Sequence, residues 1–171
     1  MSNGEWTVTP VPVDHPDAVA VVRAYLTEIV GRYWGRPATG AEVDQVLREE
    51  PSTGLETFLI ARQGGRVAGC VGLRRLDAAT GEVTKVFVHP AARGRGAGAR
   101  LLAAVEAAAG RRGMAVLRLD TRADLVEARA LYARAGYREI PRYNDSPYAA
   151  HWFEKELPPV AAAAVRPPTA S

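Results

Sequence analysis

The residues best suited to chemistry in this sequence are arginines set among glycines. They belong to one continuous run, whose members are Arg93, Gly94, Arg95, Gly96, Ala97, Gly98 and Ala99. Glycine lets the backbone turn sharply and approach a ligand closely, and the first N–H groups of a following helix have no partner within that helix. Such donors attract anions, and neighbouring arginines strengthen the attraction. The run therefore predicts an anion site, and a phosphate is the anion that fits it best.

Two nucleotide-binding patterns fit this run less well. Gly94-x-Gly96-x-x-Ala99 matches a dinucleotide fingerprint, with Asp120 near the distance expected for a ribose contact. That fingerprint places its first glycine directly after a strand, whereas residues 89–93 intervene here. A P-loop needs Gly-Lys-Ser/Thr at the start of the helix, and this run lacks that triplet. A nicotinamide-nucleotide oxidoreductase therefore stays as an alternative that the spacing disfavours.

A pair of motifs matches one known family better. The pattern Arg93-x-x-Gly96-x-Gly98, after a segment that reads Val-Phe-Val-His-Pro, resembles the acyl-CoA-binding motif of the GNAT family of N-acetyltransferases. Downstream, Ala-Arg-Ala-Leu-Tyr132-x-x-x-Gly136-Tyr resembles the fourth-helix signature of the same family. Two motifs at the right separation are more specific than either motif alone.

This resemblance implies both a fold and a reaction. The fold is α/β (α+β mixed sheet), a GNAT-like acyl-CoA N-acyltransferase fold with about six to seven strands flanked by about four helices. The reaction is transfer of an acetyl group from acetyl-CoA to a primary amine of a small molecule or peptide, by direct attack on the thioester and without a metal. Because the thioester is already activated, positioning and a base for the amine suffice. A non-catalytic acyl-CoA-binding or regulatory protein on the same fold is the alternative.

The resemblance also assigns roles to single residues. Tyr132 matches the tyrosine that donates to the departing sulfur, although it also fits a helix residue packed against the sheet. Glu82 is the first candidate for the base, acting through water, although it also fits a solvated strand-edge glutamate. Many members have an asparagine where this chain has Leu125, so the cofactor contact on that side is expected to be weaker or arranged differently. The expected cofactor-binding residues are Val86, Phe87, Val88, Arg93, Gly94, Arg95, Gly96, Ala97, Gly98 and Ala99.

The acceptor site is expected between two loops. Residues 32–37 join two helices, and the resemblance implies that this junction walls the acceptor; two aromatic residues there fit equally well as caps of the core. An arginine at position 36 or 142 suits an acceptor carboxylate, because guanidinium binds carboxylate bidentately. The candidates for acceptor binding are Tyr33, Trp34, Arg36, Asn144 and Tyr148.

The elements that must position these residues follow from the hydrophobic pattern. A strand over 82–89 is expected to carry Val83, Lys85 and Phe87 on one face. Helices are expected from an N-cap at Asp14, from a Thr39/Glu42 capping box, from about residue 98 and from about residue 124. The other expected strands are 6–12, 57–62, 67–76, 115–121, 137–140 and 149–157.

Composition bounds the remaining classes. The chain has 171 residues, 47% of them hydrophobic, with a formal net charge of +3. This suits one domain, placed at 1–157, followed by a Pro/Ala-rich tail at 158–171 that is expected to be disordered. The single cysteine, Cys70, excludes an intramolecular disulfide and a cysteine-rich metal site.

The expected partners follow from charge and hydropathy. The mild positive charge, without interleaved aromatic residues, disfavours nucleic acid. No stretch has the length and apolarity of a membrane span, and no secretory signal is recognisable at the N-terminus. The sequence therefore predicts a cytoplasmic protein that acts on a small-molecule or peptide amine, and it leaves a homodimer open.

Overall fold

The computed structural model describes residues 4–159, so most of the expected tail at 158–171 lies outside the described residues. The strands and helices lie close to the positions that the hydrophobic pattern predicts. In chain order the elements are β1 (Trp6–Pro10), α1 (Pro16–Trp34), α2 (Gly40–Glu49), β2 (Thr57–Gln63), β3 (Arg66–Arg75), β4 (Thr80–Val88), η1 (Pro90–Ala92), α3 (Ala97–Arg111), β5 (Val116–Thr121), α4 (Val126–Arg134), β6 (Arg138–Ile140) and β7 (His151–Glu156).

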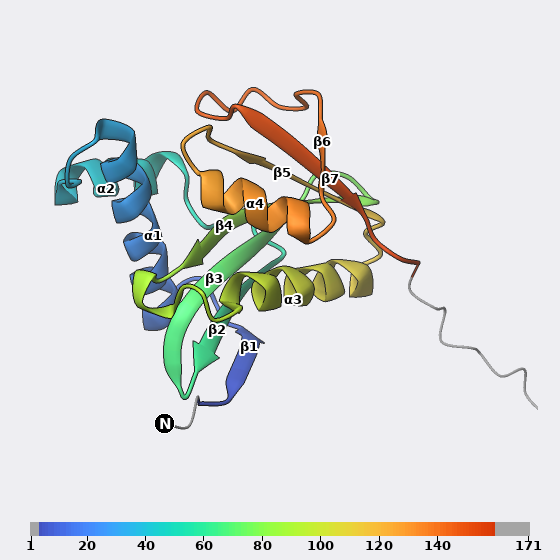
Figure 1. The fold of residues 1–171 in the computed structure, drawn as a ribbon, viewed down its shortest axis with the longest axis horizontal. Helices are drawn as coiled ribbons and strands as arrows, with labels where there is room; N and C mark the ends of the chain where they lie inside the picture. The colour runs from blue at the N-terminus through green and yellow to red at the C-terminus, as the bar shows by residue number, and fades with distance from the viewer. Residues whose placement is uncertain (1–3, 160–171) are drawn as a thin grey trace, which may run out of the picture.

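The strands form one mixed sheet of seven strands in the order β1-β2-β3-β4-β5-β7-β6. Only the β4–β5 pair is parallel, and the other neighbours are antiparallel. In Figure 1, β5, β6 and β7 occupy the upper part of the molecule, and β1, β2 and β3 the lower part. The mixed sheet and the four α-helices found within residues 4–159 confirm the predicted fold class.

The two halves of the sheet part in the middle. β4 and β5 are paired at only three positions, from Thr80↔Val116 to Glu82↔Arg118. Residues 83–88 of β4 still pair with β3, but within the described chain no strand pairs with their other edge. Backbone N–H and C=O groups at such an edge need other partners. The split therefore presents peptide groups to a ligand.

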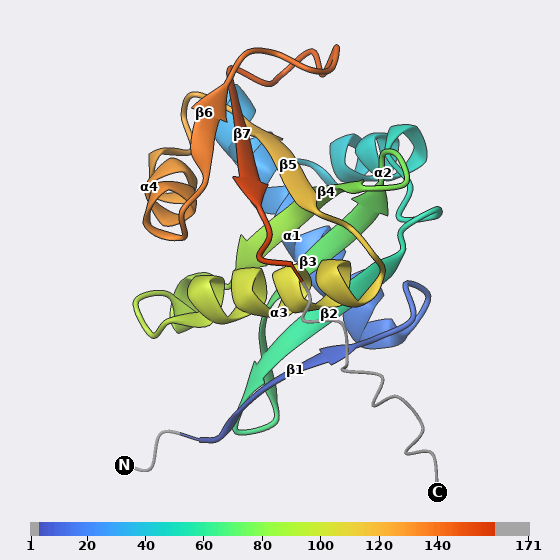
Figure 2. The same ribbon diagram turned by 90° about the vertical axis from the view of Figure 1, so that its right-hand side faces the viewer.

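Helices cover both faces of the sheet and make two cores. α3 lies across the near face of the strands in Figure 2, with α1 behind them. The core on the α3 side contains Leu101 and Leu117, and the core on the α1 side contains Val21, Ile60 and Cys70, all buried. Burial raises the pKa of the Cys70 thiol to about 12, as expected for a packing residue.

A bulge in β4 overturns the predicted alternation of that strand. The pairing with β3 shifts between Cys70↔Phe87 and Gly72↔Thr84, and Lys85 has φ +54°, a left-handed conformation that is rare for lysine. An extra residue in one strand reverses the side-chain order beyond it. Val83 consequently packs in the α3-side core and Phe87 in the α1-side core, although both were expected on one face.

The structure confirms the predicted N-cap of α2 and corrects the predicted N-cap of α1. Thr39 and Glu42 form the predicted capping box, with the Thr39 hydroxyl accepting from the Glu42 amide at 3.2 Å and a Glu42 carboxylate oxygen accepting from the Thr39 amide at 2.9 Å. The N-cap of α1 is His15, whose Nδ1 accepts from the Asp17 amide at 3.0 Å; the prediction of Asp14 was wrong. An imidazole nitrogen offers the same acceptor as a carboxylate here, which helix-start statistics underrate.

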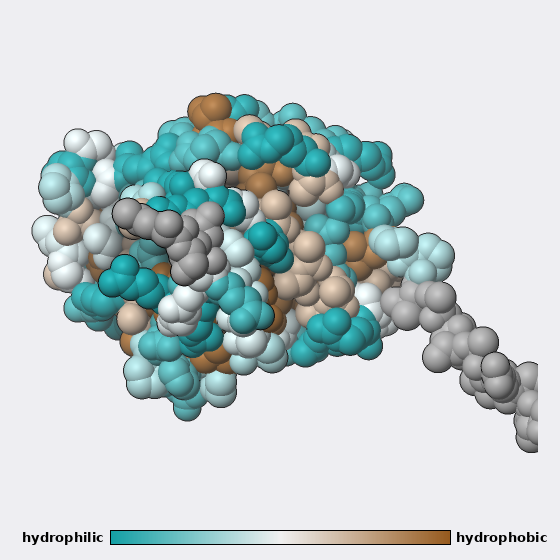
Figure 3. All heavy atoms as spheres, turned by 60° about the horizontal axis from the view of Figure 1, so that its bottom comes forward, coloured by the Kyte–Doolittle hydropathy of each residue, from teal (hydrophilic) through white to brown (hydrophobic). Residues whose placement is uncertain are grey.

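Polar side chains cover most of the face shown in Figure 3, and apolar surface lies there only in separate areas. In the described part of the chain, none of the helices has the length and apolarity needed to cross a membrane.

Candidate active site

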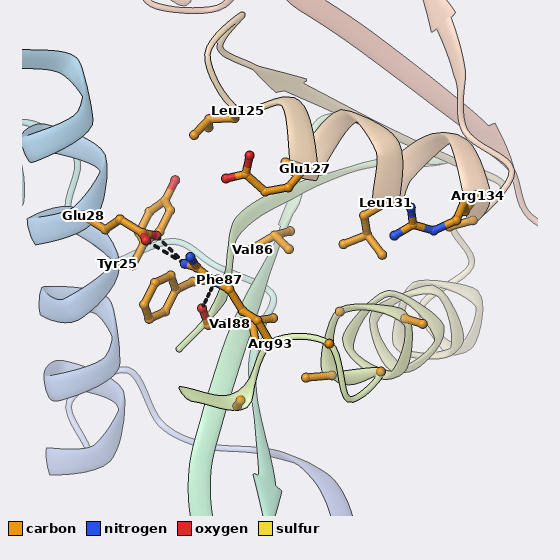
Figure 4. Close-up of a pocket in the computed structure, with 18 of the residues that line it drawn as sticks. Tyr25, Glu28, Val86, Phe87, Val88, Arg93, Leu125, Glu127, Leu131 and Arg134 are labelled. Carbon is orange, nitrogen blue, oxygen red and sulfur yellow. Dashed lines mark hydrogen bonds and ion pairs between the residues drawn. The ribbon is translucent and has the colours of Figure 1, made fainter. Parts of the chain in front are cut away.

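A groove of about 490 Å³ runs along the split in the sheet. Figure 4 shows its walls: Tyr25 and Glu28 come from α1, Val86 and Val88 from β4, and α4 lies above. The glycine loop and the first turn of α3 close the remaining side. The unpaired edge of β4 therefore forms the wall of an elongated space that ends at the predicted anion site.

The loop before α3 presents backbone donors to this groove. Gly94 has φ +78° and Gly96 has φ +87°, conformations that side chains with a Cβ rarely adopt. The first bond within α3 is donated by Arg100 to the Gly96 carbonyl at 3.2 Å. The amides of residues 97–99 precede that bond and are free by helix geometry. The groove thus ends at the positive end of a helix dipole.

Gly98 has a different role from its neighbours. A Cβ at position 98 would lie 2.8 Å from Cδ2 of Leu131 on α4, well inside van der Waals contact. The missing side chain therefore leaves room for the Leu131 side chain beside the first turn of α3, at the end of the groove.

The two loop arginines point away from each other. Arg93 lines the groove, yet its guanidinium binds Glu28 with both carboxylate oxygens at 2.7 Å, and its Nε donates to the Val88 carbonyl at 3.0 Å (Figure 4). The side chain of Arg95 reaches toward Gln63 on β2, at 3.4 Å, and Arg95 is not among the residues that line the groove.

Sequence reasoning missed a cation on the other wall of the groove. Arg134, at the end of α4, lines the space between α4 and α3 and is exposed (Figure 4). It precedes Gly136 of the fourth-helix motif, but no pattern in the sequence told it apart from the other helix arginines. Leu125, the departure from the family pattern, also lines the groove and makes that contact apolar.

A second and larger cavity, of about 1180 Å³, adjoins the groove. It lies between α1, α2, β4, the end of β5 and the loop before β7. The two spaces share five lining residues, Tyr25, Ile29, Val86, Leu125 and Ala128. They therefore meet beside β4, at the point where the sheet divides.

The two predicted catalytic residues both line the larger cavity. Tyr132 is 5% exposed and packs edge-to-face on Tyr137 with ring centroids 6.0 Å apart. Burial raises the pKa of Tyr132, so its hydroxyl keeps its proton at neutral pH. Glu82 lies at the last position where β4 pairs with β5. Its carboxylate accepts from the Tyr143 hydroxyl at 2.8 Å and lies 3.5 Å from Arg74.

Of the predicted acceptor residues, three aromatic ones form a cluster at the cavity wall. The Tyr33 ring lies edge-to-face on Trp34 at 5.0 Å and on Tyr148 at 5.3 Å between centroids. All three are more than half exposed, so they do not cap the core. Arg36 does not line the cavity: both of its terminal nitrogens bind Glu42, at 2.8 and 3.0 Å.

Asn144 lines the cavity but is held by its neighbours. Its amide donates to Asp120 at 2.7 Å, and its oxygen accepts from the Trp152 indole at 2.8 Å. Asp120 is a further carboxylate of the cavity that sequence reasoning did not place there. Its position at the end of β5 was the available signal, because β5 borders the split.

The comparisons with known proteins agree with this geometry. The sequence profile of the acetyltransferase (GNAT) family matches residues 23–137. The mycothiol acetyltransferase of Kineococcus radiotolerans is 35% identical over 164 residues, which cover 92% of this chain and 50% of that protein. The chain spans about half the length of the curated relatives it matches.

Solved structures show the same fold. A Klebsiella pneumoniae protein described as an acyl-CoA N-acyltransferase has a TM-score of 0.70 at 27% identity, covering 89% of this chain and 97% of its own. A GNAT family acetyltransferase from Elizabethkingia anophelis, solved with acetyl-CoA bound, has a TM-score of 0.64 at 18% identity, covering 89% of this chain and 98% of its own.

Proposed function

Because the chain belongs to the GNAT family of acetyltransferases, we propose that it transfers an acetyl group from acetyl-CoA to the amine of a small molecule or peptide. The observation that carries this proposal is the continuity of the site. A groove that begins at the glycine loop runs along the open edge of β4 and joins a cavity lined by Tyr132 and Glu82.

The groove fits an acyl-CoA in its chemistry. The free amides of residues 97–99 and the charge of Arg134 suit the phosphates, since helix N-termini and guanidinium groups bind anions. The unpaired peptide groups of residues 83–88 suit the amide-containing pantetheine arm. Acetyl-CoA supplies an activated thioester, so the protein needs no nucleophile of its own.

The residues of the larger cavity would serve the acceptor. A free alkylamine is largely protonated near neutral pH, and Glu82 can take its proton directly or through water. The buried, protonated Tyr132 is suited to donate to the sulfur that leaves. Retention of both groups at one cavity supports an enzyme over a non-catalytic binder on the same fold.

The acceptor residues follow from the cavity wall. Tyr33, Trp34 and Tyr148 offer apolar surface for the body of the acceptor, and Asn144 with Asp120 offers polar groups. Arg36 is engaged by Glu42, and we leave it out of the acceptor site.

The test is a panel of amines assayed for release of CoA thiol from acetyl-CoA. Turnover of at least one amine class, together with loss of turnover in Tyr132→Phe and Glu82→Gln, supports the proposal. Binding of acetyl-CoA without turnover of any amine would support the non-catalytic alternative instead.

A further inference from the structure

Lys85 is a buried cation that the proposed mechanism does not use. The residue is only 5% exposed, yet it lines the larger cavity. Among residues 4–159, no residue forms a hydrogen bond or an ion pair with its ammonium group. The ammonium nitrogen keeps some exposure to solvent, through the cavity. A buried charge without a partner is costly, so such a group is kept where a ligand completes it.

The other cations of the cavity wall already have carboxylate partners. Arg74 lies 3.5 Å from Glu82. The other two arginines of the wall form ion pairs with carboxylates that do not line the cavity: Arg75 with Glu56 at 3.0 Å, and Arg122 with Asp124 at 2.6 Å. Within the described range, Lys85 is therefore the cavity-lining cation that has no bonded carboxylate partner, and its charge is available to a ligand in the cavity.

The β-bulge is what places Lys85 in this cavity. Residues three apart on a regular strand point to opposite faces, so Glu82 and Lys85 would be separated. The bulge, with Lys85 at φ +54°, brings both onto the wall of one cavity. A left-handed lysine is strained, and such strain is concentrated at functional sites.

Lys85 has a carboxylate neighbour, Glu50, but no partner is hydrogen-bonded to its ammonium group among the described residues. Burial lowers the pKa of Lys85, the charge of Glu50 opposes that shift, and the charge of Arg74 adds a smaller lowering. An anion that binds beside the ammonium group would offset the cost of burying its charge. The carboxylates Glu82 and Asp120 on the wall suit an ammonium group instead.

We propose that Lys85 binds a carboxylate of the acceptor while the acceptor amine lies toward Glu82. This inference rests on the proposed function and narrows the acceptor to amines that carry a carboxylate, such as amino acids. It replaces the arginines expected from the sequence, because Arg36 binds Glu42, and Arg142 binds Asp145 at 3.2 Å and lines neither space. The exposed aromatic cluster favours an apolar side chain on the acceptor.

The test compares matched acceptors on matched variants. The full chain, saturated with CoA, is titrated by calorimetry with L-phenylalanine, L-leucine and L-methionine and with their amides. Of the three amino acids, the one that binds the native chain most tightly is expected to bind about tenfold more tightly than its own amide. A ratio of this size is the usual contribution of a charge-assisted hydrogen bond. In Lys85→Met the amino acid and its amide should bind equally well, whereas Lys85→Arg should retain most of the preference for the amino acid. Arg66→Met, an exposed arginine away from both spaces, controls for net charge.

Several outcomes would overturn the inference. The inference fails if the native chain binds the amino acid and its amide equally well, binds the amide more tightly, or binds neither. An equal loss for acid and amide in Lys85→Met would show a structural role. Acetylation of Lys85 by acetyl-CoA alone, seen by mass spectrometry, would make the lysine an acceptor itself. If the chain still transfers acetyl from acetyl-CoA to an amine of the panel in these cases, the proposed function stands; if acetyl-CoA does not bind, the proposed function fails first.

Discussion

Arg93 on the glycine loop binds Glu28 on α1 with both carboxylate oxygens at 2.7 Å. This ion pair, with the bond from Arg93 Nε to the Val88 carbonyl at 3.0 Å, ties the loop to α1 and to the end of β4. Much of the charge of Arg93 is therefore engaged within the protein. Binding of phosphates then depends mainly on the backbone amides of the loop and on Arg134 across the groove.

Gly96→Ala should weaken acetyl-CoA binding more than tenfold in calorimetry. At φ +87° a Cβ strains the loop by about 1 kcal/mol, and it disturbs the amides that face the groove. Gly113→Ala is the matched control, because Gly113 has φ +78°, equally free space around it and no place in the groove. Both variants should lose similar thermal stability, and only Gly96→Ala should lose affinity. Equal affinity in the two variants would separate the loop from cofactor binding.

Arg134→Gln should weaken acetyl-CoA binding by about threefold to fivefold, the usual worth of an exposed ion pair. The difference in acetyl-CoA affinity between this variant and the native chain should become smaller in high salt, because mobile ions screen exposed charges. Titrations at low and high ionic strength measure both effects, with Arg66→Gln as the control at an exposed site outside the groove. A deficit that does not depend on salt would argue for a packing role of the side chain.

Tyr132→Phe should lower kcat about a hundredfold, in the range of a lost general acid, and leave acetyl-CoA affinity unchanged. Tyr137→Phe is the control: Tyr137 packs on Tyr132, and its hydroxyl donates to Glu106 at 3.3 Å, away from the cavity. Turnover by Tyr132→Phe at the rate of Tyr137→Phe would exclude the proposed acid.

The sequence predicted the fold well and the site in part. Local signals were enough for the strands, the Thr39 capping box and the loop before α3, because each depends on neighbours in sequence. The bulge at Lys85 was invisible, because hydrophobic alternation does not reveal an extra residue in a strand. It set Val83 and Phe87 in different cores.

The partners of the arginines could not be predicted either. Arg36 is bound by Glu42, Arg93 by Glu28 and Arg95 by Gln63, and the last two pairs join segments far apart in sequence. Residue type and spacing show where an arginine lies along the chain, but only tertiary packing decides whether its charge remains for a ligand.

The Arg36–Glu42 pair predicts a pH-dependent contribution to stability. Hydrogen bonds from Arg36 and from the Thr39 amide lower the pKa of Glu42 from its ordinary value of 4.5 to about 2. A lowered pKa in the folded state means that the stabilisation is present above the ordinary pKa and is lost as the pH falls toward about 2.

Glu42→Gln should therefore lower the thermal unfolding midpoint at pH 7, and the difference from the native chain should vanish as the pH falls from about 4.5 to about 2. Glutamine retains the capping box, so the difference reports the charge. In an Arg36→Met background the same change should have a smaller effect. A difference that is constant across this pH window would contradict the assignment.

A calorimetric titration of the purified chain with acetyl-CoA, with desulfo-CoA and NAD as controls, would show most directly whether the groove along β4 binds an acyl-CoA. We expect one-to-one binding of both CoA compounds at micromolar or tighter affinity, and no binding of NAD. Absence of binding with acetyl-CoA would mean that the groove along β4 does not hold an acyl-CoA, and equal binding of NAD would mean that the groove does not select an acyl-CoA over a dinucleotide.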